Sequence, residues 1–398
     1  MAGAVTTVLR RGAVIVVALA IGAAAWLPLL HRFVEPSEAE VARPADSIVA
    51  RGMLKEQLGV WEDEARRTEL LARMRRTNPE WDFMGRTFVA MALLNEALRD
   101  SSSMDRYLAV VDRILDDTEA LIEKHGAEHF LLPYALRGAW QVLPRRSVFI
   151  DGELAWIHAA RQLVARDDAR LPQLRAHIDA IVERMTEGPV ASAESYPDEC
   201  WTFCNTVALA ALRVADVALG EDHSALRQRW VEIAKRRLVD SQTGLLVSSY
   251  RYDGSHLDGP EGSSIFMVAH DLVLVDEELA RDQWTRARKE LGKEALGFAW
   301  SREWPAHAKK RGVDVDSGPI VPFVEASAGA SGMAVLGAAT FEDRTMLRGL
   351  LASMGLAAFP IDRGGARRYA ASNQVGDAVV LYALLQGPIV ERVRRGSR

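Results

Sequence analysis

The chain has 398 residues, of which 49% are hydrophobic and 26% are charged, and this is the composition of an ordinary globular protein. Its formal charge of −5 disfavours nucleic acid as a partner, because nucleic-acid-binding proteins carry a basic stripe. Two cysteines are too few for a disulfide scaffold or a four-thiolate zinc site. Function must therefore be inferred from local features of the sequence.

The N-terminal segment has the length and composition of a membrane span. Residues 12–30 (GAVIVVALAIGAAAWLPLL) carry no charge, and a helix of this length crosses a hydrocarbon core of about 30 Å. Arg10 and Arg11 precede it, so the positive-inside rule places residues 1–11 in the cytoplasm and the rest of the chain outside it. We expect a single-pass anchor in the cell inner membrane and a linker at 31–49. The alternative is a signal peptide cleaved near residues 23–25.

From residue 50 onward, apolar residues recur with the period of a helix. This period predicts twelve helices, at 50–76, 84–99, 103–124, 151–165, 169–187, 199–219, 222–240, 262–278, 281–297, 325–339, 342–357 and 373–387.

Two kinds of helix alternate along this part of the chain. One kind is small and apolar nearly all round, which is typical of buried helices, and the other carries a charged face. Turns are short after the apolar helices and loops are long before most of them, which gathers the long loops at one end. Six inner and six outer helices predict an all-α (α/α)₆ toroid over residues 50–390, in which helix 50–76 closes the ring. A basic tail follows at 391–398, and an open α-solenoid is the alternative fold.

Polar residues gather where the inner helices begin, and long loops on a rigid scaffold commonly build a site. Segment 195–205 (SYPDECWTFCN) holds both cysteines, Cys200 and Cys204, which share one face if the segment is helical. A disulfide, a zinc site and simple burial are the structural alternatives for these cysteines. The functional interpretation is a thiol near a helix start, where the dipole lowers its pKa.

The candidate residues form two groups. The side chains expected to perform acid/base catalysis are Cys204, Asp198, Tyr196, Glu153 and Asp316. The side chains expected to contact substrate are Asn205, Tyr252, His256, Glu261 and Asn373, with residues 244–258 forming a small hairpin over the site. Helix capping is the structural alternative for each carboxylate. The chain has no H-E-x-x-H, G-x-S-x-G, Walker or G-x-G-x-x-G motif, and we expect neither a metal nor a cofactor.

Residues 196–244 resemble the central part of the linalool dehydratase/isomerase family, in which a Glu-Pro-Asx and an aromatic residue precede a Cys-Asn pair that enters a small-residue helix. The matching residues are Pro197, Asp198, Phe203, Cys204 and Asn205. The resemblance implies an (α/α)₆ barrel and cofactor-free dehydration or isomerisation of a tertiary allylic alcohol, with Cys, His, Tyr and Asp sharing the acid/base work. Cys204 is then a catalytic thiol. This chain departs from the family at Ser195, where the second cysteine stands, and at Tyr196, where the family has Glu.

The sequence leads to one main hypothesis and two alternatives. The main hypothesis is a membrane-anchored lyase or isomerase that acts on an alcohol by acid/base catalysis, with the C-terminal domain extracytoplasmic. The first alternative is an (α/α)₆ glycan hydrolase or polysaccharide lyase, which the ten tryptophans favour. The second is a non-catalytic envelope protein. The expected partners are a small-molecule or glycan substrate and the membrane, and a homo-oligomer is compatible with the sequence.

Overall fold

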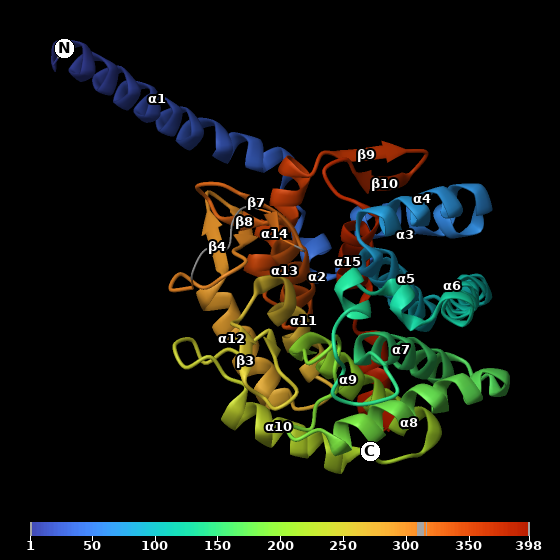
Figure 1. The fold of residues 1–398 in the computed structure, drawn as a ribbon. Helices are drawn as coiled ribbons and strands as arrows, with labels where there is room; N and C mark the ends of the chain where they lie inside the picture. The colour runs from blue at the N-terminus through green and yellow to red at the C-terminus, as the bar shows by residue number, and fades with distance from the viewer. Residues whose placement is uncertain (1, 309–313, 316, 397–398) are drawn as a thin grey trace.

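Six apolar helices form a closed inner ring in the computed structural model, which describes residues 2–308, 314–315 and 317–396 (Figure 1). These helices are α5 (Pro79–Arg99), α7 (Val148–Val164), α9 (Thr202–Leu219), α11 (Gly262–Leu272), α13 (Ala328–Thr340) and α15 (Gln374–Leu385). Each helix packs on the next in this order, and α15 packs back on α5. The contact between α15 and α5 closes the ring, which confirms the predicted toroid.

Small residues allow the inner helices to approach one another closely. In the contact between α7 and α9, a Cβ atom added to Gly152 would lie 3.3 Å from the backbone nitrogen of Ala208. All residues of α7 are buried, because this helix is covered on every side. Close packing of this kind explains why the inner helices are apolar nearly all round.

The outer layer follows the inner helices along the chain. Its helices are α6 (Met104–His125), α8 (Leu171–Glu187), α10 (Ser224–Arg237), α12 (Glu277–Glu290) and α14 (Arg344–Ala357). The predicted helix 50–76 is two helices, α3 (Ile48–Glu62) on α15 and α4 (Glu64–Thr77) on α5. They separate at Asp63, whose side chain caps α4 by accepting a hydrogen bond from the backbone N–H of Arg66 at 3.1 Å.

Shorter helical segments complete the chain. They are α2 (Glu38–Ala42), η1 (Pro44–Asp46), η2 (Ser101–Ser103), η3 (Ala127–Phe130), η4 (Pro133–Leu136), η5 (Asp168–Arg170) and α16 (Pro388–Gly396). The stretch expected as a basic tail belongs to α16 as far as Gly396, and this helix buries Ile389 and Val393.

Among the described residues, three small antiparallel sheets occupy the long loops. The first has the order β1 (Cys200–Trp201), β2 (Ser249–Tyr250) and β3 (His256–Asp258). The second has the order β4 (Gly292–Ala295), β5 (Phe298–Ser301), β8 (Ala326–Ser327), β7 (Gly318–Val321) and β6 (Asp314–Val315). The third pairs β9 (Pro360–Arg363) with β10 (Ala366–Tyr369).

Several predicted helices are shorter in the structure, such as α11, which ends at Leu272 rather than at 278, and two of them show the cause. The prediction over 281–297 runs too far, because α12 ends at Glu290 and the chain turns into β4 and β5 around Gly297, which has a φ of +86°. The turn requires the left-handed backbone that glycine adopts readily. The prediction over 199–219 starts too early, because residues 200–201 pair with β2 as a strand before α9 begins.

The N-terminal helix α1 (Ala2–Val34) projects away from the ring (Figure 1). Its stretch Leu9–Val34 is long and apolar enough to cross a membrane and is not buried, so it is a candidate membrane span or signal sequence. The second stretch that passes this test, Thr202–Leu219, is core helix α9 and is largely buried. The base of α1 contacts the ring, since the imidazole Nε2 of His31 lies 2.9 Å from the carbonyl oxygen of Gly297.

Candidate functional site

A cavity of about 410 Å³ lies at the end of the ring where α5, α7, α9 and α11 begin. Its aromatic lining consists of Trp81, Tyr134, Phe149, Tyr196, Trp201, Phe203 and Trp304. Its acidic lining consists of Glu80, Glu199, Asp258, Glu261 and Glu303. The other described lining residues are Met84, Leu132, Cys204, Ser263, Ser264 and Ser317. None of the described residues that line the cavity is basic.

Carboxyl groups and helix ends both contribute charge to this cavity. Four helix N-termini face this end, and each contributes roughly half a positive charge. Five carboxyl groups stand among the described lining residues. A carboxylate that faces a ligand stabilises positive charge on it.

A tight turn in segment 195–204 directs side chains into the cavity. The backbone N–H of Glu199 donates to the carbonyl oxygen of Tyr196 at 3.0 Å, and Asp198 has a φ of +55°. Tyr196, Glu199 and Cys204 line the cavity. Asp198 lies outside it, because its carboxylate binds the guanidinium of Arg251 at 2.7 Å.

Cys204 presents a protonated thiol to the cavity. Burial raises the pKa of the Cys204 thiol well above its ordinary value, and the nearby carboxylates of Glu80, Glu153 and Glu199 act in the same direction. A hydrogen bond with Ser195 lowers it by less. The expectation that the helix start lowers this pKa is therefore wrong, because burial outweighs the dipole.

The cysteines are not paired with each other. Cys200 and Cys204 are both free and buried, and Cys200 lies on β1 rather than on the helix of Cys204. The shared helical face expected for them is absent, because α9 starts only at Thr202. Ser195, which stands where the family has its second cysteine, contacts the thiol of Cys204.

Tyr196 forms a buried hydrogen bond with a carboxylate from another helix. Its hydroxyl donates to the carboxylate of Glu80 and accepts from the backbone N–H of Leu132 at 2.9 Å. Burial and the charge of Glu80 raise the pKa of Tyr196. The pair is therefore a proton donor and acceptor already in contact, as concerted proton transfer requires.

Glu199 is held by two aromatic residues of the same cavity. The indole Nε1 of Trp201 donates to Glu199 at 2.6 Å, and the hydroxyl of Tyr134 donates to it at 3.2 Å. The ring of Tyr134 also stacks on that of Tyr196, with centroids 4.6 Å apart. These contacts fix the position of the carboxylate against the aromatic wall.

The carboxylate of Glu303 also lines the cavity, as do two buried hydrogen-bond donors, Trp304 and Ser317. It accepts hydrogen bonds from the hydroxyl of Ser263 and, at 2.5 Å, from that of Ser327. The indole Nε1 of Trp304 and the hydroxyl of Ser317 are buried and have no hydrogen-bond partner among the described residues. Because both side chains line the cavity, they are available to hydrogen-bond a ligand or water there.

Three of the residues predicted from the sequence line the cavity, namely Cys204, Tyr196 and Glu261. Asn205 is fully buried behind it and positions segment 195–204, because its amide exchanges hydrogen bonds with the backbone of Ala193 at 2.8 and 3.1 Å. Glu153 is also buried, on α7, and burial raises its pKa to about 8.

The structure does not bring the remaining predicted residues into the cavity. Tyr252 contacts Asp198 through its backbone N–H, and the imidazole of His256 is held 2.7 Å from the carbonyl oxygen of Arg237 on the surface. Asn373 caps α15 and lines a different cavity of about 270 Å³. Asp316 lies outside the described residues.

The lining residues that the sequence did not predict come from helix starts and loops. Glu80 was missed because α5 begins at Pro79 rather than at residue 84. The signal for this start is present, since Asn78 caps the helix and proline favours the first helical position. Glu303 and Trp304 follow β5 in a long loop, and no local pattern singles them out.

Three solved glycoside hydrolases show a weak likeness to this chain. A glycoside hydrolase of family 105 from C. acetobutylicum is 14% identical, with a TM-score of 0.48, over 81% of this chain and 98% of that one. An unsaturated glucuronyl hydrolase from Streptococcus agalactiae is 13% identical, with a TM-score of 0.45, over 76% of this chain and 80% of that one. A family 76 glycoside hydrolase (mannosidase) from Bacteroides thetaiotaomicron is 12% identical, with a TM-score of 0.46, over 80% and 88%.

The family comparison is more decisive. The model of the linalool dehydratase/isomerase family matches residues 173–375, which are 203 of the 398 residues in the chain. The matched region contains the turn at 195–204, helix α9 and the loop with Glu303, and thus much of the cavity lining. The chain belongs to the linalool dehydratase/isomerase family.

Proposed function

We propose that the cavity catalyses the elimination of water from an alcohol, or its isomerisation, by acid/base chemistry. The observation that carries the proposal is the cavity itself, in which a protonated thiol, a tyrosine–carboxylate pair and an aromatic wall meet. Breaking a carbon–oxygen bond leaves positive charge on carbon. Carboxylates of the cavity lining and the faces of its aromatic rings stabilise such charge.

The proton donor in this proposal is Cys204. Its raised pKa keeps the thiol protonated, so it can transfer a proton to the hydroxyl group, which then leaves as water. The thiolate formed by this transfer would be costly beside ionised carboxylates. Loss of a proton from the neighbouring carbon to a carboxylate in the same step neutralises that carboxylate, so the negative charge of the cavity does not increase. Ser195 is placed to hydrogen-bond the sulfur during this step.

The proton acceptor in this proposal is the pair of Tyr196 and Glu80. The tyrosine oxygen takes the proton from carbon while its own proton moves to the Glu80 carboxylate, to which it is already bonded. A tyrosinate does not accumulate, because burial makes it unfavourable. The C–H and C–O bonds break, an alkene and water form, and proton return from Glu80 to Cys204 resets the site.

A second candidate function is glycan hydrolysis. Three tryptophans line the cavity, Trp81, Trp201 and Trp304, and aromatic faces together with paired carboxylates suit sugars and the positive transition state of glycoside cleavage. This chemistry needs two carboxylates but no thiol. The two functions therefore differ in whether Cys204 matters.

The test is a comparison of substrates on the full-length protein in detergent. Tertiary and allylic alcohols are assayed for alkene by headspace gas chromatography, and oligosaccharides are assayed for new reducing ends. Alkene formation supports the proposal, whereas release of reducing ends supports the glycan alternative. Turnover of neither class would overturn both and favour the non-catalytic envelope protein.

We also propose that α1 anchors the protein in a membrane, with residues 1–11 cytoplasmic and the ring on the other side. Exposed apolar side chains occur in segments that adjoin the base of α1, and we name Leu296, Phe323, Val324 and Phe359 the apolar collar. Leu296 precedes Gly297, which contacts His31 of α1, and Val324 accepts a hydrogen bond from Trp300 of the adjoining β5. The collar is therefore positioned to contact the bilayer that α1 enters.

A further inference from the structure

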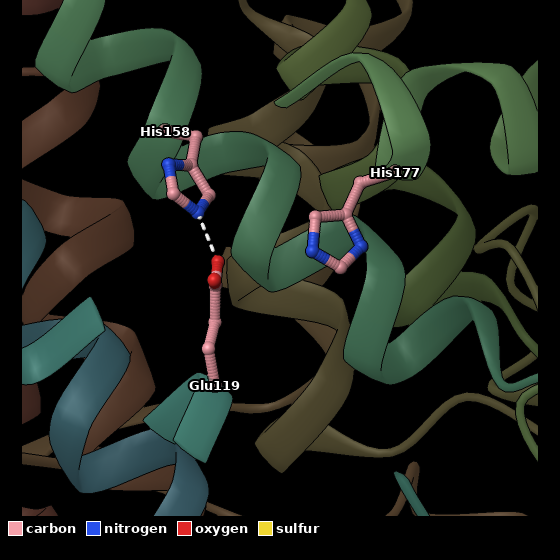
Figure 2. Close-up of side chains that lie close together, drawn as sticks. All are labelled: Glu119, His158 and His177. Atoms are coloured by element: carbon pink, nitrogen blue, oxygen red, sulfur yellow. Dashed lines mark hydrogen bonds and ion pairs between the residues drawn. The ribbon is translucent and has the colours of Figure 1, made fainter. Parts of the chain in front are cut away.

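A second group of side chains lies away from the cavity, between three consecutive helices. It consists of Glu119 on α6, His158 on α7 and His177 on α8 (Figure 2). One ligand atom from each side chain lies within 4.8 Å of the others. His158 stands ten residues after the first residue of α7, and so about 15 Å from the end that faces the cavity. The group is thus separate from the site described above.

His177 is oriented as metal-binding histidines are. Its Nδ1 atom lies 2.8 Å from a carboxylate oxygen of Asp151, which is itself buried and held by two hydrogen bonds from Arg146, at 2.6 and 2.8 Å. The other ring nitrogen faces Glu119 and His158 in Figure 2. A carboxylate on one nitrogen fixes the ring and leaves Nε2 to bind a metal.

His158 supplies a second nitrogen whose position is fixed by burial. Its ring is fully buried and lies parallel to that of His177, with centroids 6.1 Å apart. Its Nε2 atom lies 2.5 Å from Glu119, and its Nδ1 atom has no hydrogen-bond partner among the described residues.

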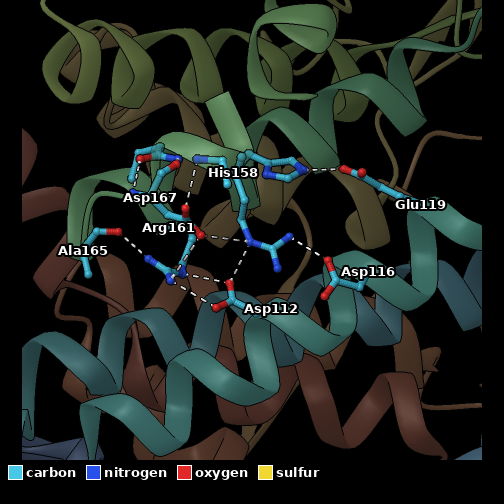
Figure 3. A network of polar contacts seen from close by, with 10 residues as sticks. Asp112, Asp116, Glu119, His158, Arg161, Ala165 and Asp167 are labelled. Atoms are coloured by element: carbon cyan, nitrogen blue, oxygen red, sulfur yellow. Dashed lines mark hydrogen bonds and ion pairs between the residues drawn. The ribbon is translucent and has the colours of Figure 1, made fainter. Parts of the chain in front are cut away.

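The nearby arginines bind other carboxylates, so Glu119 stays available to the histidines. The surplus of negative charge around the group favours a cation. Arg161 binds Asp112 at 2.9 and 3.1 Å, and Arg170 binds Asp116 at 2.8 Å, in the network of Figure 3. In this part of the described structure the carboxylates outnumber the guanidinium groups. They are Asp112, Asp116, Glu119, Asp151 and Asp167, against Arg146, Arg161 and Arg170.

We propose that Glu119, His158 and His177 bind one divalent transition-metal ion, with Zn²⁺ the best fit, and with water as the fourth ligand. Two imidazoles and one carboxylate are a common zinc ligand set, and imidazole also suits other first-row metals. Metal–ligand bonds of about 2.0–2.1 Å in a tetrahedron place ligand atoms roughly 3.3 Å apart. Glu119 therefore has to move away from His158 by about 1 Å, and any pair of ligand atoms near the 4.8 Å limit has to come closer together. Glu119 is about a quarter exposed and has room to do so.

The ion would join an inner helix to both of its outer neighbours. Since α6, α7 and α8 follow one another in the chain, the ion would cross-link one sector of the ring. It would take no part in the chemistry of the cavity. Metal binding then raises folding stability with the logarithm of the free metal concentration, once this exceeds the Kd.

The experiment measures zinc binding by the full-length protein after treatment with a chelator. Zn²⁺ is titrated in competition with a chromophoric chelator, and the melting temperature is followed in parallel. We expect one ion per chain and a higher melting temperature with zinc. His177→Gln and Glu119→Gln, both at partly exposed positions, should weaken binding by more than the ~10–100-fold that outer-shell changes cost, and Asp151→Asn by about that amount.

Two controls and a second readout keep the result interpretable. His256→Gln and His125→Gln should leave zinc affinity unchanged, because these histidines lie outside the group. Circular dichroism shows whether each variant is folded, and Co²⁺ in place of Zn²⁺ should give the visible absorption of a four-coordinate site. Binding that is equal in wild type and in folded His177→Gln and Glu119→Gln variants would overturn the proposal, as would absence of stoichiometric binding.

Discussion

Buried ionisable side chains set the proton chemistry of single residues in this protein. Burial raises the pKa of Cys204 and Glu153, and it raises that of Asp271, which is buried close enough to Glu153 for the two charges to interact. One oxygen of Glu153 and one of Asp271 have no hydrogen-bond partner among the described residues. With a pKa of about 8, the carboxyl group of Glu153 is protonated over much of the neutral range, which spares the ring an unpaired buried charge.

This protonation predicts a pH-dependent stability. The pKa of Glu153 rises from 4.5 to about 8 on folding, so the folded protein keeps a proton that the unfolded chain releases. The free energy of unfolding should fall as pH rises from about 4.5 to about 8, by at most about 1.4 kcal/mol per pH unit. Glu153→Gln stays neutral and should flatten this slope.

The measurement is urea unfolding at pH 5 and pH 8 for the wild type and Glu153→Gln. Glu232→Gln, at an exposed position in the middle of α10, is the matched control and should follow the wild type. An equal fall in stability from pH 5 to pH 8 in the wild type and Glu153→Gln would show that Glu153 does not hold the proton.

At the scale of elements, the sequence predicts the helices well and the loops poorly. Alternating apolar and amphipathic helices indicate the closed ring, because packing against neighbours leaves a clear pattern in each helix. The five-stranded sheet around β5 was missed because its strands are two to four residues long and leave no alternating pattern. The same loops supply Glu303 and Trp304, which explains why they were missed as well.

The two histidines of the proposed metal site illustrate a different limit. His158 lies on an apolar helix and looks like an isolated core residue in the sequence, and His177 lies nineteen positions later on the next helix. The packing of α8 on α7 brings the two histidines close to each other, and α6 adds Glu119. A spacing that depends on the angle between two helices has no fixed sequence signature.

Helix packing in the ring predicts the effect of enlarging a glycine. Gly152→Val should lower the free energy of unfolding by about 1–3 kcal/mol, because even a Cβ atom would crowd Ala208 on α9. Gly85→Ala, on inner helix α5, should instead raise it by about 0.5–1 kcal/mol, because its nearest neighbours lie 3.8 Å away. Denaturant unfolding of both variants tests this, and a Gly152→Val variant as stable as the wild type would contradict the close contact.

At the scale of the whole molecule, several contacts attach the base of α1 to the ring. Besides the contact of His31 with Gly297, Val34 lies against Gly355 of α14, and Arg348 of the same helix pairs with Glu35 and Glu38. The base of α1 is thus attached to one side of the ring, next to the apolar collar.

This arrangement predicts two contributions to membrane binding. The full-length chain should be found in the membrane fraction, and removal of residues 1–30 should release most of it. The shortened chain should keep weak binding to lipid vesicles, which Leu296→Ser together with Phe323→Ser abolishes, as measured by vesicle sedimentation. Leu257→Ser, an exposed apolar residue on β3 rather than at the base of α1, is the matched control. Equal sedimentation of the collar variant and its parent would rule out contact of the collar with lipid.

The most direct test of the proposed chemistry is the rate of alkene formation from an accepted alcohol by the wild type, Cys204→Ser and Cys200→Ser. The thiol of Cys204 lines the cavity, whereas that of Cys200 is buried on β1 and does not line it. Loss of a general acid predicts a rate lower by ~10²–10⁴-fold in Cys204→Ser, with Cys200→Ser close to the wild type. Equal rates in the wild type and Cys204→Ser would contradict catalysis by the thiol.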